Sequence, residues 1–220
     1  MKIFLDTADI SMISPAYDTG LLDGVTTNPT LILKSGKQLS EVIETISHFS
    51  YLESISAEVV ADDAPEMLSQ AQKYYTISPA VTIKVPCTVE GLKACKYLSK
   101  QGIQTNVTLV FSVAQAILAS KAGATYISPF VGRWMDNSID GIGLIKSIRQ
   151  AFDYSKTDTQ ILAASIRDVR QVEQCALAGA DVVTIPPVVF WAMYKNIMTE
   201  KGLELFQKDW DEVIRSQEDK

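Results

Sequence analysis

The sequence predicts an α/β fold: a single-domain (β/α)8 TIM barrel with an extra C-terminal helix. Eight short runs of branched apolar residues alternate with helical patterns along the 220 residues, and no linker, low-complexity segment or charge run interrupts them. Such alternation indicates a parallel sheet, and eight strand–helix units indicate that the sheet closes into a barrel. A doubly wound open sheet is the alternative.

The local patterns place each element in turn. The expected strands cover residues 2–6, 24–28, 55–60, 80–86, 103–110, 125–130, 160–164 and 181–185. Helices are expected over residues 9–18, 38–50, 139–152 and 167–178, and after Pro29, Asp63, Thr88, Ser112 and Pro187. Asp63, Thr88 and Ser112 carry N-cap signatures. We assign residues 1–201 to the barrel.

Residues 202–220 form the expected C-terminal helix and tail. Leu203, Phe206, Trp210 and Val213 make an apolar stripe at three- and four-residue spacing. Because a closed barrel has no obvious place for this stripe, we expect it to pack either on the outside of its own barrel or on a neighbouring subunit.

Composition argues against several classes of function. The chain is 47% hydrophobic and 21% charged, and its net charge of −6 argues against a nucleic-acid partner but not against small anions. No apolar run reaches the roughly 18 residues that span a bilayer, and the N-terminus turns acidic at Asp6, so no membrane association or signal peptide is expected. Cys87, Cys95 and Cys175 are odd in number and widely spaced, which indicates a reduced, cytoplasmic protein.

The histidine count limits the chemistry further. The single histidine, His48, falls on the polar face of an amphipathic segment and is expected to be solvated. Serine–histidine catalysis and a histidine-ligated zinc site are therefore nearly excluded, and no metal is expected. No glycine-rich phosphate loop follows any strand, so no nucleotide cofactor is expected.

Lys84 is the most unusual residue of the expected strands. Val81, Ile83 and Val85 point to one face of its strand, so Lys84 points to the other face, into the barrel. Burial is costly for an ammonium and favours the neutral amine, whose lone pair a Schiff-base nucleophile uses. A strand-end lysine that reaches water is the simpler alternative for this residue taken alone.

Polar residues near the ends of the other strands share the inward parity of Lys84. On the fifth strand, for example, Asn106 and Thr108 face inward, while Val107 and Leu109 are expected outside. Chemistry in such barrels sits at the C-terminal strand ends, and so many polar groups would make a costly core. The expected site residues are Asp6, Thr26, Asn28, Glu58, Asn106, Thr108, Ser128 and Phe130, with Ser165 just past the seventh strand.

These residue types suit one kind of chemistry. Lys84 can condense with a carbonyl, and Asp6 and Glu58 can transfer protons in place of the missing histidines. Asn28 and Asn106 can hold substrate hydroxyls, because an amide both donates and accepts hydrogen bonds.

Two arginines suggest a phosphate site. Arg133 and Arg167 lie just past the sixth and seventh strands, where barrels often bind a phosphate, and a guanidinium can hold a phosphate with two hydrogen bonds. Arginines on barrel loops are also commonly solvated, so neither residue is decisive by itself.

At these residues the sequence resembles the small-subunit transaldolase and fructose-6-phosphate aldolase family, over essentially the whole chain. The resemblance implies a (β/α)8 barrel, metal-free class I Schiff-base chemistry on sugar phosphates, and a homo-oligomer, a pentamer or a decamer. It is carried by residues 4–8 (FLDTA), 24–29 (GVTTNP), 83–86 (IKVP), 90–92 (EGL), 105–112 (TNVTLVFS), 128–133 (SPFVGR) and 164–167 (ASIR).

The resemblance also implies a role for each site residue. The lysine at the Lys84 position forms the imine, and the aspartate at Asp6 is the general acid–base for carbon–carbon cleavage. The asparagines at Asn28 and Asn106 bind the dihydroxyacetone portion of the substrate. The phosphate-binding residues are those at Arg133, Ser165 and Arg167.

Two positions distinguish the family's two activities. Aldolases have glutamine where Glu58 stands and tyrosine where Phe130 stands, whereas transaldolases have glutamate and phenylalanine, with a serine at Ser128, as here. Glu58 with Thr108 can position and deprotonate the water of imine formation and breakdown. Without a tyrosine hydroxyl, the site would hold the enamine until an aldehyde acceptor arrives.

We therefore expect a transaldolase of the pentose phosphate pathway. It would convert sedoheptulose 7-phosphate and glyceraldehyde 3-phosphate to erythrose 4-phosphate and fructose 6-phosphate. Fructose-6-phosphate aldolase is the alternative within the family, and a non-catalytic sugar-phosphate-binding barrel is the alternative of a different class.

Overall fold

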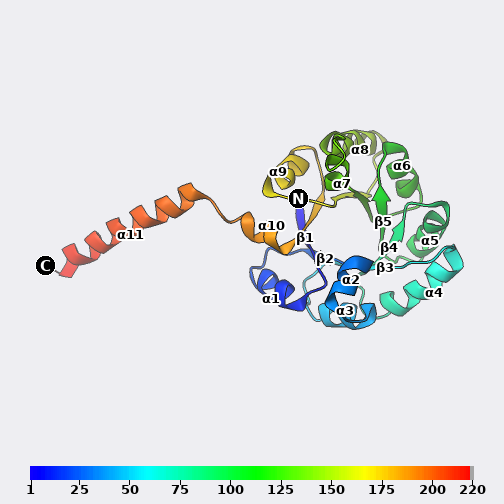
Figure 1. Ribbon diagram of the computed structural model, residues 1–220, viewed down its shortest axis with the longest axis horizontal. Helices are drawn as coiled ribbons and strands as arrows, with labels where there is room; N and C mark the ends of the chain where they lie inside the picture. Colours follow the sequence, from blue (N-terminus) through cyan, green and yellow to red (C-terminus); the bar gives the residue numbers. More distant parts are fainter. Residues whose placement is uncertain (219–220) are drawn as a thin grey trace.

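The protein is a closed barrel of eight parallel strands inside a ring of helices (Figure 1). A computed structural model describes residues 1–218. Each strand pairs with the next along the chain, and β8 pairs with β1, so the expected barrel is confirmed and the open-sheet alternative is wrong. The strands are β1 (Lys2–Asp6), β2 (Gly24–Thr26), β3 (Ser54–Glu58), β4 (Val81–Pro86), β5 (Thr105–Val110), β6 (Tyr126–Pro129), β7 (Gln160–Ala163) and β8 (Val182–Ile185).

Helices follow each strand, and the expected N-caps are present. The side chains of Asp63, Thr88 and Ser112 each accept a hydrogen bond from a backbone N–H of the first helical turn. The short helix α7 was not expected. The helices are α1 (Ile10–Asp18), α2 (Pro29–Ser35), α3 (Leu39–Ile46), α4 (Ala64–Tyr75), α5 (Val89–Lys100), α6 (Val113–Lys121), α7 (Val131–Met135), α8 (Gly141–Ser155), α9 (Val169–Leu177), α10 (Pro187–Ala192) and α11 (Ile197–Glu218).

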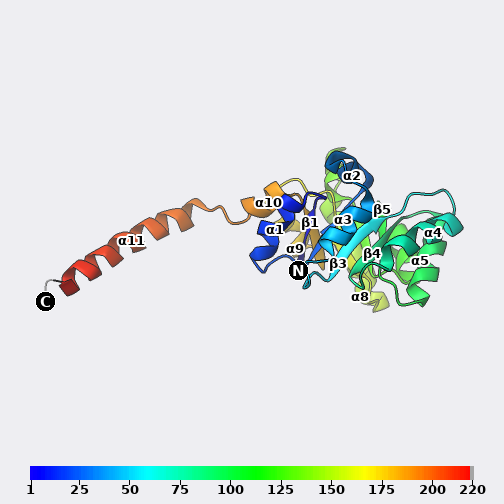
Figure 2. The ribbon, with the colours of Figure 1, turned by 90° about the horizontal axis from the view of Figure 1, so that it is seen from below.

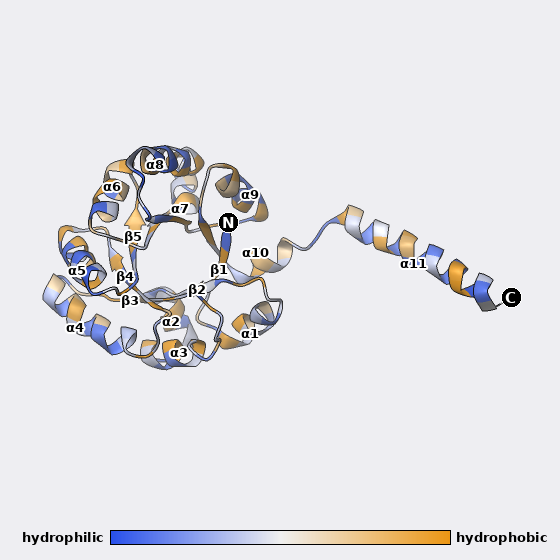
Figure 3. Ribbon diagram, turned by 180° about the vertical axis from the view of Figure 1, so that it is seen from behind, coloured by the Kyte–Doolittle hydropathy of each residue, from blue (hydrophilic) through white to orange (hydrophobic). Residues whose placement is uncertain are grey.

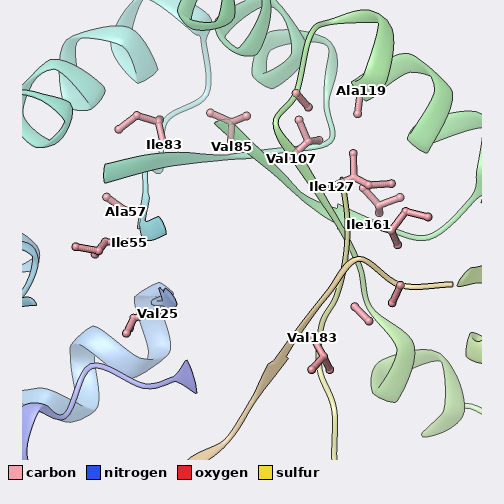
Figure 4. Packing of buried hydrophobic residues seen from close by; sticks show 14 of the residues in the cluster. Val25, Ile55, Ala57, Ile83, Val85, Val107, Ala119, Ile127, Ile161 and Val183 are labelled. Atoms are coloured by element: carbon pink, nitrogen blue, oxygen red, sulfur yellow. The ribbon is translucent and has the colours of Figure 1, made fainter. Parts of the chain in front are cut away.

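The main hydrophobic core lies between the outer face of the barrel and the helices (Figure 4). It is built from alternate residues of each strand, so the residues between them point into the barrel. The buried strand residues labelled in Figure 4 are Val25, Ile55, Ala57, Ile83, Val85, Val107, Ile127, Ile161 and Val183.

A second apolar cluster lies inside the barrel, mostly toward the N-terminal ends of the strands. The Phe4 and Tyr126 rings meet edge to face with centroids 5.7 Å apart, and Leu162 and Val182 complete the layer. Gly24 allows this packing, because a Cβ there would lie 2.8 Å from the Phe4 ring. On the β3–β4 side of the interior, the buried hydroxyls of Ser54 and Thr82 lie 2.7 Å apart, so the apolar layer covers only part of the space beneath the site.

The last helix, α11, extends away from the barrel (Figure 2). It begins upstream of the expected Gly202, and hydrophobic and hydrophilic residues recur along it (Figure 3). Leu203, Phe206 and Trp210 remain 64%, 69% and 60% exposed, so the structure does not show the stripe packed on its own barrel. The chain division at residue 201 stays a prediction, and residues 219–220 of the expected tail lie outside the described residues. None of the described helices combines the length and apolar character needed to cross a membrane.

Candidate active site

A cavity of about 430 Å³ opens at the C-terminal ends of the strands. This is the end of a (β/α)8 barrel at which chemistry is expected, because the strand-to-helix loops meet there. All the site residues expected from the sequence line this one cavity: Asp6, Thr26, Asn28, Glu58, Lys84, Asn106, Thr108, Ser128, Phe130, Arg133, Ser165 and Arg167.

Lys84 is held at the base of the cavity by contacts on two sides. Its Nζ lies 3.0 Å from Oε2 of Glu58, and it donates a 3.2 Å hydrogen bond to the carbonyl oxygen of Thr27. The strand register places Glu58, Lys84 and Asn106 side by side on β3, β4 and β5. The Lys84 side chain is only 7% exposed, so it is not a strand-end lysine extended into water. Glu58 is placed to take the proton that the ammonium must lose before it can attack a carbonyl.

Asp6 lies at the C-terminal end of β1, partly buried in the wall of the cavity. Its Oδ1 accepts a 2.8 Å hydrogen bond from the Thr26 hydroxyl, whose oxygen lies 2.5 Å from that of Thr184. Burial raises the pKa of the Asp6 carboxyl above its usual value, and the Thr26 hydrogen bond and the positive charges of Lys84 and Arg167 oppose that rise. A carboxyl whose pKa is raised is a stronger base than an ordinary aspartate, which suits a group that removes a proton and later returns it.

The two asparagines present hydrogen-bond donors to the cavity. Oδ1 of Asn28 accepts from the Leu31 backbone N–H and caps α2, and Oδ1 of Asn106 accepts a 2.8 Å hydrogen bond from the Ser128 hydroxyl. Among the described residues, neither the buried Nδ2 of Asn106 nor the buried Oγ1 of Thr108 has a hydrogen-bond partner. Because buried polar groups are rarely left unpaired, these two atoms indicate a place for a polar ligand.

Arg133 and Arg167 lie at the mouth of the cavity. The Arg133 guanidinium lies 4.9 Å from the centroid of the Phe130 ring, a cation–π contact. Arg167 pairs with Asp136 at 2.9 Å, and both side chains are about half exposed. Since exposed ion pairs contribute little free energy, Arg167 can exchange this partner for a substrate anion.

A close backbone contact brings α7, which carries Arg133, against the loop that carries Arg167. A Cβ on Gly132 would lie 1.8 Å from the carbonyl oxygen of Ser165, so only glycine fits there. Ser165 itself has φ +63°, a left-handed conformation that is uncommon for serine. The helix α7 after β6 and the loop after β7 are thus fixed against each other, which places Arg133 and Arg167 on the same side of the cavity.

Comparison with known proteins identifies the family. The sequence matches the family described as Transaldolase/Fructose-6-phosphate aldolase over residues 3–218. The chain belongs to this family. It is 53% identical over 211 residues to a probable transaldolase of Paracoccus denitrificans (strain Pd 1222), with 96% of each chain covered. It is 50% identical over 217 residues to a probable transaldolase of Maricaulis maris (strain MCS10), covering 98% of this chain and 99% of that one. The resemblance noted in the sequence is thereby confirmed.

Several residues that line the cavity of this transaldolase/fructose-6-phosphate aldolase family member were not expected from the sequence. Thr184 stands at an inward position of β8, and the strand parity that located Asp6 could have found it. Leu31 and Lys34 lie on α2, and they line the cavity because of where that helix sits, which no local pattern reveals.

For Leu109 the sequence-based expectation is wrong. Simple alternation along β5 placed its side chain among the helices, but it lines the cavity and is 36% exposed. An irregular register between β5 and β6, together with a φ of +59°, turns this residue to the inner side.

Proposed function

We propose that the protein is a transaldolase, which transfers a dihydroxyacetone unit from sedoheptulose 7-phosphate to glyceraldehyde 3-phosphate through a Schiff base on Lys84. The observation that carries this proposal is the 3.0 Å contact between the buried Lys84 amine and Glu58, in the cavity that Phe130 also lines. Relatives that are named probable transaldolases and match nearly the whole chain support it.

The reaction begins with imine formation. Glu58 accepts a proton from the Lys84 ammonium, and the neutral amine attacks the C2 carbonyl carbon of the ketose phosphate. The resulting carbinolamine loses its oxygen as water and becomes an iminium ion. Glu58 and Thr108 can hold this water, because the Thr108 hydroxyl is buried without a protein partner in the described part of the chain.

Carbon–carbon cleavage and transfer follow, with Asp6 as the acid–base. Asp6 removes the proton of the C4 hydroxyl, the C3–C4 bond breaks, and its electron pair flows into the iminium to give an enamine. Erythrose 4-phosphate leaves as the aldehyde. The enamine carbon then attacks the aldehyde carbon of glyceraldehyde 3-phosphate, and Asp6 returns its proton to the new hydroxyl. Water hydrolyses the imine and releases fructose 6-phosphate.

The remaining site residues bind the substrate in this proposal. The Nδ2 groups of Asn28 and Asn106 donate to hydroxyl oxygens of the three-carbon unit, and Ser128 orients the Asn106 amide through its hydrogen bond. Thr26 holds the Asp6 carboxyl in place. The phosphate lies between Arg133 on α7 and Ser165 and Arg167 in the loop after β7, two segments that the Gly132 contact holds together.

One experiment tests the proposed function directly. We expect the wild-type protein to transfer the three-carbon unit and to release little free dihydroxyacetone, since Phe130 supplies no hydroxyl to protonate the enamine. Phe130→Tyr should raise release from fructose 6-phosphate at the expense of transfer. The assay follows dihydroxyacetone with and without an acceptor aldehyde. Equal rates of release and transfer in the wild type would replace this proposal with the aldolase alternative.

A second prediction concerns phosphate recognition. Arg133→Ala or Arg167→Ala should cost about 1.5–3 kcal/mol of substrate binding, or roughly ten- to hundredfold in KM, because each removes a charge-assisted contact. An unphosphorylated donor should be affected far less, which steady-state kinetics on both substrates would show. Arg170→Ala is the matched control, since Arg170 is an exposed arginine of α9 outside the set that lines the cavity. Equal losses on both substrates would instead assign the arginines a structural role.

The exposed stripe of α11 leads us to propose a homo-oligomer as the working form. Leu203, Phe206 and Trp210 are among the large apolar side chains of this helix that lie in solvent in the single chain, and a second copy of the chain can cover them. Shortening the chain to Asn196, or changing both Phe206→Glu and Trp210→Glu, should yield smaller assemblies in light scattering. Lys208→Glu, on the opposite side of the helix, is the control. An unchanged mass would contradict this use of α11, and the pentamer or decamer implied by the resemblance stays a prediction.

The redox state of the cysteines indicates the cellular compartment of the protein. Cys87, Cys95 and Cys175 are all free thiols, and Cys95 and Cys175 are fully buried. Free thiols are typical of reducing compartments, so we include a cytoplasmic location in the proposal.

A further inference from the structure

Leu109 adopts a backbone conformation that leucine rarely takes. Its φ of +59° lies in the left-handed region, where the Cβ of an L-residue crowds the following carbonyl oxygen. Of the non-glycine residues with positive φ in residues 1–218, Leu109 is the one that lies within a β-strand.

A bulge in β5 accounts for this conformation. Val107 pairs with Ile127, but the next recorded pair joins Val110 to Pro129, so β5 carries one residue more than β6 over this stretch. Pairing resumes beyond the bulge, where the Phe130 N–H donates a 3.2 Å hydrogen bond to the Val110 carbonyl oxygen. Such bulges re-aim a side chain and are frequent beside active sites.

The bulge exchanges the roles of two neighbouring residues. Val110 takes the outer position and is fully buried against the helices, while Leu109 lines the cavity that contains Lys84. Lys84 on β4 pairs with Asn106 on β5. Leu109 comes three residues after Asn106, so it lies nearer than Lys84 to the mouth of the cavity.

Folding alone does not favour a leucine here. Glycine or asparagine would adopt a left-handed conformation with less strain, and the Leu109 side chain remains 36% exposed instead of adding to the core. Strain of this kind persists where the surrounding structure enforces it, and it is concentrated at functional sites. The apolar side chain therefore has a use in the cavity.

We propose that Leu109 is a specificity-determining residue, which shields the three-carbon enamine on Lys84 from bulk water and so favours transfer over release. This inference rests on the proposed function. Leu109 on β5 and Phe130 just after the neighbouring β6 both contribute apolar side chains to a cavity that is lined mostly by polar and charged residues. Release begins when solvent delivers a proton to the enamine carbon, after which water adds to the iminium carbon and frees dihydroxyacetone and the amine. Transfer begins when the same carbon bonds to the acceptor aldehyde, so excluding the solvent proton selects transfer.

Hydrogen exchange measures this shielding without any acceptor. When the enzyme is incubated with dihydroxyacetone in D2O, each imine–enamine cycle removes a proton from the carbon beside the imine and adds a deuteron from solvent. Leu109→Asn keeps the branching of the side chain and its number of heavy atoms, tolerates positive φ and adds polarity. We expect it to raise the exchange rate, followed by NMR, by about tenfold, which corresponds to about 1.4 kcal/mol in the barrier. Leu109→Gly, which removes both the strain and the side chain, should do the same.

Two further measurements exclude a merely structural effect. The midpoint of urea unfolding of both Leu109 variants should equal or exceed that of the wild type. The ratio of released dihydroxyacetone to fructose 6-phosphate formed should rise together with the exchange rate. Leu177→Asn is the control, because Leu177 on α9 is 90% exposed and lies outside the cavity lining. Leu177→Asn should leave both the exchange rate and the ratio of released dihydroxyacetone to fructose 6-phosphate unchanged.

The outcomes separate this inference from the proposed function. Unchanged exchange in both Leu109 variants would overturn the shielding role, and so would a fall in the urea midpoint accompanied by an equal loss of every activity. Failure of the proposed function would appear in the wild type, either as an absence of borohydride-trapped dihydroxyacetone on Lys84 or as equal rates of release and transfer.

Discussion

Lys84→Met is expected to abolish transfer and borohydride trapping together. Trapping depends on an imine, in which hydride reduction fixes the substrate to the amine, and methionine offers no amine. Activity should fall by at least about 10⁴-fold, since the covalent route supplies much of an enzymatic acceleration that typically exceeds 10⁶-fold. Kinetics and mass spectrometry of the borohydride-treated protein would measure both effects.

Two further variants separate chemistry from folding at this position. Lys84→Arg keeps a positive charge beside Glu58, which would otherwise be left unpaired in a largely buried site, but a guanidinium does not form the imine. It should therefore fold and remain inactive. Lys34→Met removes the other lysine that lines the cavity and should leave trapping on Lys84 intact. Trapping that survived in Lys84→Met would place the imine elsewhere and contradict the mechanism.

Asp6→Asn is expected to lower the rate and to raise the stability. The amide cannot exchange a proton with the C4 hydroxyl, so kcat should fall by about 10²–10⁴-fold, the usual contribution of a general acid–base. Trapping on Lys84 should persist, because imine formation depends on Glu58. The amide oxygen can still accept the Thr26 hydrogen bond, while the cost of burying a carboxylate is removed, so the midpoint of urea unfolding at pH 7 should rise.

The pH dependence gives this prediction a definite sign. Burial raises the pKa of Asp6 in the folded protein above its unfolded value, so the folded state binds the Asp6 proton more tightly. The resulting stabilisation is fully present below the unfolded pKa and is lost as the pH rises through the folded pKa. The stability advantage of Asp6→Asn should therefore appear at neutral pH and shrink as the pH falls toward about 4, the ordinary value for aspartate. The exposed Asp62→Asn is the control, and a constant advantage at all pH values would contradict a buried carboxylate as its cause.

The sequence by itself determined the barrel and most of its active site. Strand–helix alternation predicted the closed sheet, because parallel strands need crossover helices and eight units close a barrel. Strand parity then collected Asp6, Glu58, Lys84 and Asn106 on the inner face, since successive side chains of a strand point to opposite sides. Strand–helix alternation and strand parity are both regularities over short stretches of the chain, so the order of the residues is enough to reveal them.

The tertiary structure alone decided where that regularity breaks. One extra residue in β5, seen only when β5 is paired with β6, moved Leu109 from the helix side into the cavity. The Asn28 and Asn106 amides became hydrogen-bond donors to the cavity because their oxygens cap α2 and bind Ser128. The stripe of α11 was visible in the sequence, but its position away from the barrel was not. Pairing register, side-chain partners and the direction of an unpacked helix depend on contacts between distant segments, which the spacing of residues along a chain does not encode.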